Sequence, residues 1–152
     1  MKSINEFQGE YRWLSNFWPC YLIYQDILYP SVEHAYQATK VENVDIKTAI
    51  KNCQTPADAK DFFEVQGVRP DPGWTIPKKL GIMEELLKIK FGGKDPFLTR
   101  ALLETCDADI IEGNTWNDTF WGVCNGSGEN NLGRLLMKVR EELFQQNQQG
   151  FT

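Results

Sequence analysis

The chain has 152 residues, of which 41% are hydrophobic and 24% are charged, as is usual for one soluble globular domain whose core needs no disulfide or metal. Its formal net charge of −5 argues against broad electrostatic binding to a nucleic-acid backbone. The four cysteines are scattered, and the start MKSINEF has no apolar leader, so we expect free thiols, no transmembrane segment and a cytoplasmic protein.

The first thirty residues have the pattern of short strands, at residues 4–7, 21–24 and 27–29, around a loop at residues 9–19. Within this loop, Ser15 and Asn16 interrupt an aromatic run. The loop is either packed into the core, with Asn16 forming a local turn, or part of a pocket wall.

The next segment, residues 29–40, reads as a helix capped by Ser31. At helical spacing Glu33, Gln37 and Lys40 share one stripe, so an acid, an amide and an amine lie on one face. This face is either a catalytic surface or an ordinary solvated one. Gln37 is accordingly an orienting amide or plain helix surface.

His34 is the only histidine of the chain. No ligand pair has the spacing of a zinc site, so no metal is expected. A Ser-His-Asp or Cys-His nucleophile system would have to use His34. Since it lies on a different helical face from Glu33 and Lys40, we do not expect such a system.

The remainder of the chain is predicted to be mainly helical. Caps and apolar periodicity predict helices at 45–52, 56–66, 77–91, 96–105 and 132–145, a structured loop at 68–77 and a short strand at 109–112. We therefore predict a helix-dominated α+β single domain over residues 1–146, with a small, mostly antiparallel sheet near its N-terminus. Residues 147–152 are predicted to be a disordered polar tail.

A polar and glycine-rich segment precedes the last helix. Within ten residues, this segment contains Glu112, Asn114, Asp118 and Trp121. Its polar side chains either form turns by bonding the local backbone, or place a carboxylate beside an aromatic pocket wall. The following loop, WGVCNGSGENNLGR, has Asn130 or Asn131 as a cap for the last helix and Arg134 in its first turn. Such a loop either binds phosphate through backbone N–H groups or simply makes turns.

A series of short motifs follows a defined order along the chain. They are Phe7, Gly9 and Ser15–Phe17; Tyr29–Lys40; Thr55–Lys60; Met83 and Lys90-Phe91; Leu102-Leu103; Glu112, Asp118 and Trp121-Gly122; and Asn130–Met137. In this order they resemble the NADAR family, also called YbiA-like, over nearly the whole chain. One departure is Asp61-Phe62, where the family usually has Gly-Arg, and this change alters the local basicity.

The resemblance implies a YbiA-like fold and an enzyme that cleaves N-glycosidic bonds. Some members of the family hydrolyse ribosylamino-pyrimidine phosphates of early riboflavin synthesis, and others remove ADP-ribose from guanine in nucleic acid. The resemblance nominates Glu33, Lys40, Asp118, Trp121 and Asn131 as the pocket, with Ser15 and Asn16 nearby. We therefore expect catalytic roles for Glu33, Lys40 and Asp118, and substrate contacts from Ser15, Asn16, Trp121, Gly122, Asn130, Asn131 and Arg134, without a cofactor.

These residue types suit the implied chemistry. A carboxylate such as Glu33 can stabilise an oxocarbenium ion or activate water. A neutral Lys40 can instead form a Schiff base with the opened sugar, which requires desolvation of the amine. Acidity of the chain favours a small-molecule substrate, with nucleic acid only as the carrier of a modified base. The alternative is a module that binds NAD or ADP-ribose without turnover, which would not need Glu33 and Lys40 together.

Overall fold

The computed structural model of the chain describes residues 2–149 and divides them into two compact units. Unit 1 comprises the chain up to Ser15 and from Leu87 onward, and unit 2 comprises Asn16–Leu86. Helix α4, Ile76–Lys90, contributes residues to both units. None of the helices in residues 2–149 combines the length and apolarity that crossing a membrane requires.

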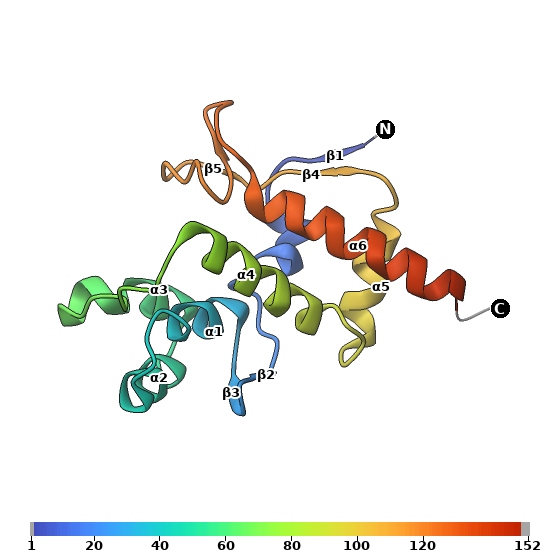
Figure 1. Ribbon diagram of the computed structural model, residues 1–152. Helices are drawn as coiled ribbons and strands as arrows, with labels where there is room; N and C mark the ends of the chain where they lie inside the picture. Colours follow the sequence, from blue (N-terminus) through green and yellow to red (C-terminus); the bar gives the residue numbers. More distant parts are fainter. Residues whose placement is uncertain (1, 150–152) are drawn as a thin grey trace. The chain divides into compact units, whose positions relative to one another are not determined.

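Unit 2 is built on a hairpin and three packed helices (Figure 1). Its elements are β2 (Leu22–Tyr24), β3 (Ile27–Tyr29), α1 (Val32–Ala38), α2 (Val44–Lys51) and α3 (Pro56–Gln66). Strands β2 and β3 pair antiparallel around a turn in which Gln25 and Asp26 both have positive φ. Helix α1 packs against β3, α2 and α3, so every residue of α1 is buried.

The ends of the unit 2 helices follow from their sequences. Thr55 caps α3 by accepting a hydrogen bond from the Asp58 N–H, and Pro56 occupies the first turn. Gly67 ends α3 with a φ of 66°, the left-handed conformation that glycine adopts without strain. Lys47 of α2 donates a 2.9 Å hydrogen bond to the carbonyl of Ala38, at the C-terminal end of α1. A cation at this end complements the helix dipole.

Unit 1 combines two strand pairs, one of them long-range, with helices α5 and α6 (Figure 1). Its elements are β1 (Ser3–Ile4), the 3₁₀ helix η1 (Gly9–Leu14), α5 (Pro96–Glu104), β4 (Asp109–Ile110), β5 (Gly113–Asn114), β6 (Val123–Cys124) and α6 (Asn131–Gln149). Pairing of β1 with β4 and of β5 with β6 is parallel. Helix α6 packs on β4 and α5, and it buries Leu132, Leu136 and Val139.

The described residues confirm a helix-dominated α+β architecture and correct three details. Of the three described strand pairs, only β2–β3 is antiparallel, so the expectation of a mostly antiparallel sheet is wrong. The predicted loop at residues 9–19 contains η1. Helix α6 continues to Gln149, so residues 147–149 are helical, and 150–152 of the predicted tail lie outside the described residues.

Candidate active-site residues

The start of helix α1 confirms the predicted cap. The Ser31 Oγ accepts a 3.1 Å hydrogen bond from the His34 N–H and lies 2.7 Å from His34 Nδ1. The other ring nitrogen, Nε2, lies 3.0 Å from the carbonyl oxygen of Cys53. Because a carbonyl only accepts, Nε2 carries a proton, and in the neutral ring Nδ1 accepts from the Ser31 hydroxyl. Both ring nitrogens of His34 are therefore used to hold α1 in place.

Glu33 lies on a buried helix surface. Its residue is 8% exposed and Gln37, one turn later, is 4% exposed. The Gln37 Nε2 donates a 2.7 Å hydrogen bond to the Glu33 Oε2, and the Glu33 N–H donates to the carbonyl oxygen of Asn16 at 3.1 Å. The interpretation of this stripe as a solvated helix face is therefore wrong.

Lys40 lies just beyond the end of α1, in a partly apolar environment. Its Nζ is 5.3 Å from the centre of the Tyr36 ring and 5.6 Å from that of Phe63. Its backbone carbonyl accepts a 2.8 Å hydrogen bond from the Asp71 N–H, which fixes the chain at this position.

The pKa of Lys40 is lowered from its ordinary value, and burial of the amine is the main cause. Glu33 opposes this effect by raising the pKa, and Lys79 adds to it by lowering the pKa. Desolvation therefore outweighs attraction to the carboxylate. The direction of this change is the one that the Schiff-base route requires.

The segment Ser15-Asn16 is held through its backbone. The buried Lys90 donates from Nζ to the carbonyl oxygen of Ser15 at 2.9 Å. The Asn16 carbonyl accepts from Glu33, and its side-chain Nδ2 lies 3.6 Å from the Met83 Sδ. Lys90 is a supporting residue that residue-by-residue reasoning missed. The signal for it was a lysine just before Phe91, at the end of a helix whose apolar stripe is buried.

Asp118 organises the loop between β5 and β6. Its Oδ1 accepts from the N–H groups of Phe120 and Trp121 at 3.2 and 2.9 Å. Its backbone N–H and carbonyl bind the side chain of Asn114 at 3.0 and 2.8 Å. Asp118 and Asn114 thus act as turn formers, and Asp118 fixes the backbone that carries Trp121. A catalytic role for Asp118 stays a prediction.

The glycine-rich loop uses most of its N–H groups internally. Backbone N–H groups that donate within the protein are those of Val123, Cys124, Ser127, Glu129, Asn130, Asn131, Leu132 and Arg134. At its tip, Asn125 and Gly126 have positive φ and form a tight turn between Cys124 and Ser127. These bonds favour the turn-forming alternative over a phosphate cradle made of backbone N–H groups.

The remaining predicted contact residues lie around the start of α6. The Asn130 side chain accepts from the Glu112 N–H and donates to the carbonyl of Ile110, at 3.0 and 2.9 Å. The Asn131 Nδ2 donates to the Phe120 carbonyl at 2.9 Å. Gly122 is buried, whereas Arg134 is exposed on α6.

The candidate residues thus form two groups. Asn16, Glu33 and Lys40 belong to unit 2. A backbone hydrogen bond links Glu33 to Asn16, and the charge of Glu33 acts on the amine of Lys40. Ser15 and the predicted residues from Asp118 onward belong to unit 1, where Asp118, Trp121 and Asn131 surround one loop.

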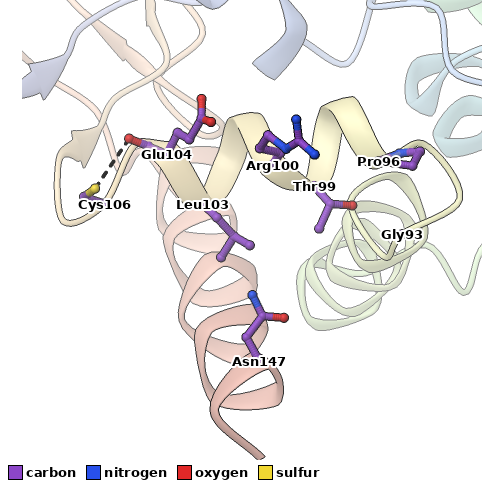
Figure 2. Close-up of a pocket in the computed structure, with 8 residues that line it drawn as sticks. All are labelled: Gly93, Pro96, Thr99, Arg100, Leu103, Glu104, Cys106 and Asn147. Atoms are coloured by element: carbon purple, nitrogen blue, oxygen red, sulfur yellow. Dashed lines mark hydrogen bonds between the residues drawn. The ribbon is translucent and has the colours of Figure 1, made fainter. Parts of the chain in front are cut away.

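Two cavities of unit 1 are lined by other residues. One, of about 520 Å³, lies against α5 and the end of α6 (Figure 2), and its lining includes Thr99, Leu103 and Asn147. The second, of about 420 Å³, is bordered by Asn5, Asn114 and Trp116 among others. Neither lining includes a residue predicted to contact substrate.

Comparison with known proteins gives concordant results. The family model described as the NADAR domain matches residues 4–144. An N-glycosidase of Nostoc punctiforme is 34% identical over 88% of this chain and 86% of its own length. A riboflavin biosynthesis protein of Vibrio vulnificus is 35% identical over 86% of this chain, which spans only 35% of that protein.

The fold has a solved counterpart. The NMR structure of the Escherichia coli protein YbiA matches with a TM-score of 0.83 and 28% sequence identity, and the match covers 97% of this chain and 89% of that one. The match agrees with the YbiA-like α+β fold expected from the sequence. From the family model and the Nostoc relative together, the chain belongs to the NADAR family.

Proposed function

We propose that this chain is an N-glycosidase that hydrolyses the C1′–N bond of a phosphorylated ribosyl compound. The observation that carries the proposal is the buried Glu33, held by Gln37, beside a Lys40 whose pKa is lowered by burial. The names of the relatives support it, since one is called an N-glycosidase and another a riboflavin biosynthesis protein.

The proposed reaction uses Lys40 as nucleophile. When the ribose ring opens, the C1′–O4′ bond breaks, O4′ keeps the electron pair and takes a proton from solvent, and the C1′–N bond becomes an iminium. The neutral Nζ of Lys40 then adds to C1′, and the borrowed proton returns to solvent when the final hydrolysis forms the aldehyde. A proton passes from Nζ to the substrate nitrogen, which leaves as an amine, so that a Schiff base joins Lys40 to the sugar. Water then adds to C1′, and loss of Nζ releases the free sugar. Glu33, whose charge acts on Lys40, is the carboxylate that we assign as the proton carrier in both halves.

The favoured substrate is a small ribosylamino-pyrimidine phosphate. With a net charge of −5, the chain has no general attraction for a nucleic-acid backbone. ADP-ribose attached to a guanine base is the second candidate, since it presents the same C1′–N bond. A non-catalytic module for NAD or ADP-ribose has no use for a buried acid beside an amine of lowered pKa.

Turnover of defined substrates tests the proposal. The protein is incubated with a ribosylamino-pyrimidine phosphate and, separately, with ADP-ribosylated guanosine, and the released reducing sugar is measured. We expect release from the first, and a fall in kcat of about 10²–10⁴-fold for Glu33→Gln. Glu42→Gln, an exposed change, serves as the control. No release from either substrate, together with binding of ADP-ribose, would establish the binding module instead.

Chemical trapping tests the role of Lys40. Borohydride reduces a Schiff base to a stable secondary amine, so the sugar stays attached to the protein and peptide mass spectrometry locates it. We expect the adduct on Lys40 and none in Lys40→Met, whereas Lys94→Met still forms it. An active enzyme that yields no adduct would assign Lys40 an electrostatic role only.

A further inference from the structure

We propose that Gln37 positions Glu33 through its amide nitrogen and selects ribose through its amide oxygen, which accepts a hydrogen bond from the 2′-hydroxyl of the substrate. This inference rests on the proposed function and names a specificity determinant within it. Its starting point is the contact between Gln37 and Glu33 on α1.

The orientation of the Gln37 amide follows from its partner. An ionised carboxylate only accepts hydrogen bonds, so the group 2.7 Å from the Glu33 Oε2 must be the amide NH₂. The carbonyl oxygen Oε1 therefore points to the other side. Within the described residues, Oε1 is buried and has no hydrogen-bond partner. A buried amide oxygen of this kind is rare in folded proteins and calls for a donor.

A second amide oxygen of the same kind belongs to the other residue that holds Glu33. Asn16 accepts from the Glu33 N–H with its backbone carbonyl. The described residues also provide no hydrogen-bond partner for its buried side-chain Oδ1. Gln37 bonds Glu33 through its side chain and Asn16 bonds it through its backbone, and each of these two residues presents a buried amide oxygen without a donor among the described residues.

Acceptor groups alone select a particular kind of ligand. A carboxylate and two amide oxygens repel phosphate oxygens and attract O–H and N–H groups. On a ribosyl substrate, the donor nearest to the reacting C1′ is the hydroxyl on the adjacent carbon, C2′. Oε1 and Nε2 are bonded to the same carbon, so a hydroxyl at Oε1 lies beside the carboxylate that acts at C1′. The 2′-hydroxyl is therefore the group that Gln37 is placed to recognise.

The decisive experiment is a double comparison of enzyme and substrate. Wild type and Gln37→Met are each assayed with the ribosyl substrate and its 2′-deoxyribosyl analogue. We expect wild type to prefer the ribosyl substrate by about tenfold or more in kcat/KM, and Gln37→Met to lose most of this preference. An equal preference in both proteins would overturn the proposal while leaving the N-glycosidase activity intact. Thermal melting of Gln37→Met checks that the variant is folded.

A second variant separates positioning from mere packing. Gln37→Glu keeps the shape and the acceptor but places a second carboxylate against Glu33, and like charges raise the pKa of such a pair. We expect the acid limb of the pH profile of kcat/KM to move to higher pH. An unchanged acid limb would refute the contact between Gln37 and Glu33 during turnover.

Product binding keeps the test independent of turnover. Calorimetry compares ribose 5-phosphate with 2-deoxyribose 5-phosphate on both proteins. If wild type binds ribose 5-phosphate more tightly and Gln37→Met does not discriminate, the role of Gln37 stands even where no substrate is hydrolysed. Equal binding of the two sugars by wild type, together with no preference in turnover, would overturn it.

Discussion

Lys40 lies where burial and one neighbouring charge lower its pKa and a second neighbouring charge raises it. Burial and Lys79 lower the pKa, and Glu33 raises it. A lysine amine is a nucleophile only when neutral, so the net lowering brings the reactive form into a lower pH range than an exposed lysine would have. The proposed chemistry thus depends on the environment of one amine.

Lys79 offers a test of this environment. Its positive charge lowers the pKa of Lys40, so in Lys79→Met the pKa of Lys40 rises and the neutral fraction at a given pH falls. We expect the rise of kcat/KM with pH to move to higher pH, and borohydride trapping at fixed pH to slow down. Lys94→Met removes an exposed charge that is not among the causes of the lowered pKa of Lys40, and it should leave the profile unchanged. A profile that is identical in Lys79→Met would contradict the proposed nucleophile.

At the scale of elements, the loop between β5 and β6 is held by close backbone approach. Gly122 lies directly against the carbonyl and carboxylate of Glu112, so a Cβ at this position would collide with both. The N–H of Val123 donates to the same Glu112 carbonyl at 2.8 Å. The loop that presents Trp121 is therefore built on a glycine that has no room for a side chain.

Two glycine substitutions should have opposite effects on stability. Gly122→Ala should lower the free energy of unfolding by about 3 kcal/mol or more, because backbone atoms must move apart. Gly81→Ala, on an exposed site of α4 with open space around it, should raise it by about 0.5–1 kcal/mol. Chemical denaturation measures both. A neutral Gly122→Ala would show that the loop adjusts without cost.

Arg140 connects helix α6 to the turn that follows α5. The guanidinium of this buried arginine donates to the Thr105 hydroxyl and to the Ala108 carbonyl, at 2.9 and 2.8 Å. Arg140→Met should destabilise the protein by about 2 kcal/mol, since two acceptors lose their donor. Lys138→Met, exposed on the same helix, should change stability by less than about 0.5 kcal/mol. Similar effects of the two changes in denaturant unfolding would contradict this role.

The elements differ in how well sequence predicts them. Helices with capping residues can be predicted from sequence. Helix α3 spans the predicted residues 56–66 because Thr55, Pro56 and Gly67 mark both ends. Strands of two residues have no periodicity, so the parallel pairing of Ser3–Ile4 with Asp109–Ile110 could not be predicted. Within α6, the Gln145 side chain bonds Glu141 one turn earlier, and helix continues through glutamines that read as a tail.

The candidate residues show the same limit. Helical spacing predicted that Glu33 and Gln37 share a face, and the hydrogen bond between them confirms it. Spacing does not say whether a polar face is buried, because burial of α1 depends on packing against α2, α3 and β3. Lys90 and Asn16 reach their partners over long stretches of chain, which no local pattern records.

At the scale of the whole molecule, net charge affects substrate approach. A chain with a charge of −5 repels polyanions, and salt screens this repulsion. We expect kcat/KM for an ADP-ribosylated oligonucleotide to increase as salt rises from low to physiological concentration. The kcat/KM for the ribosylamino-pyrimidine phosphate, which carries far fewer charges, should change less. Steady-state kinetics over a salt series measures both. A steep loss of oligonucleotide activity with salt would instead reveal a local basic surface for nucleic acid.

The division into units has a consequence for biosynthesis. Residues 16–86 follow one another without interruption, whereas the other unit needs both the first fifteen residues and everything after Leu86. Because the ribosome synthesises the chain from the N-terminus onward, the segment that carries Glu33 and Lys40 is complete before the other unit. The opening strand β1 must wait for its partner β4, more than one hundred residues later in the order of translation.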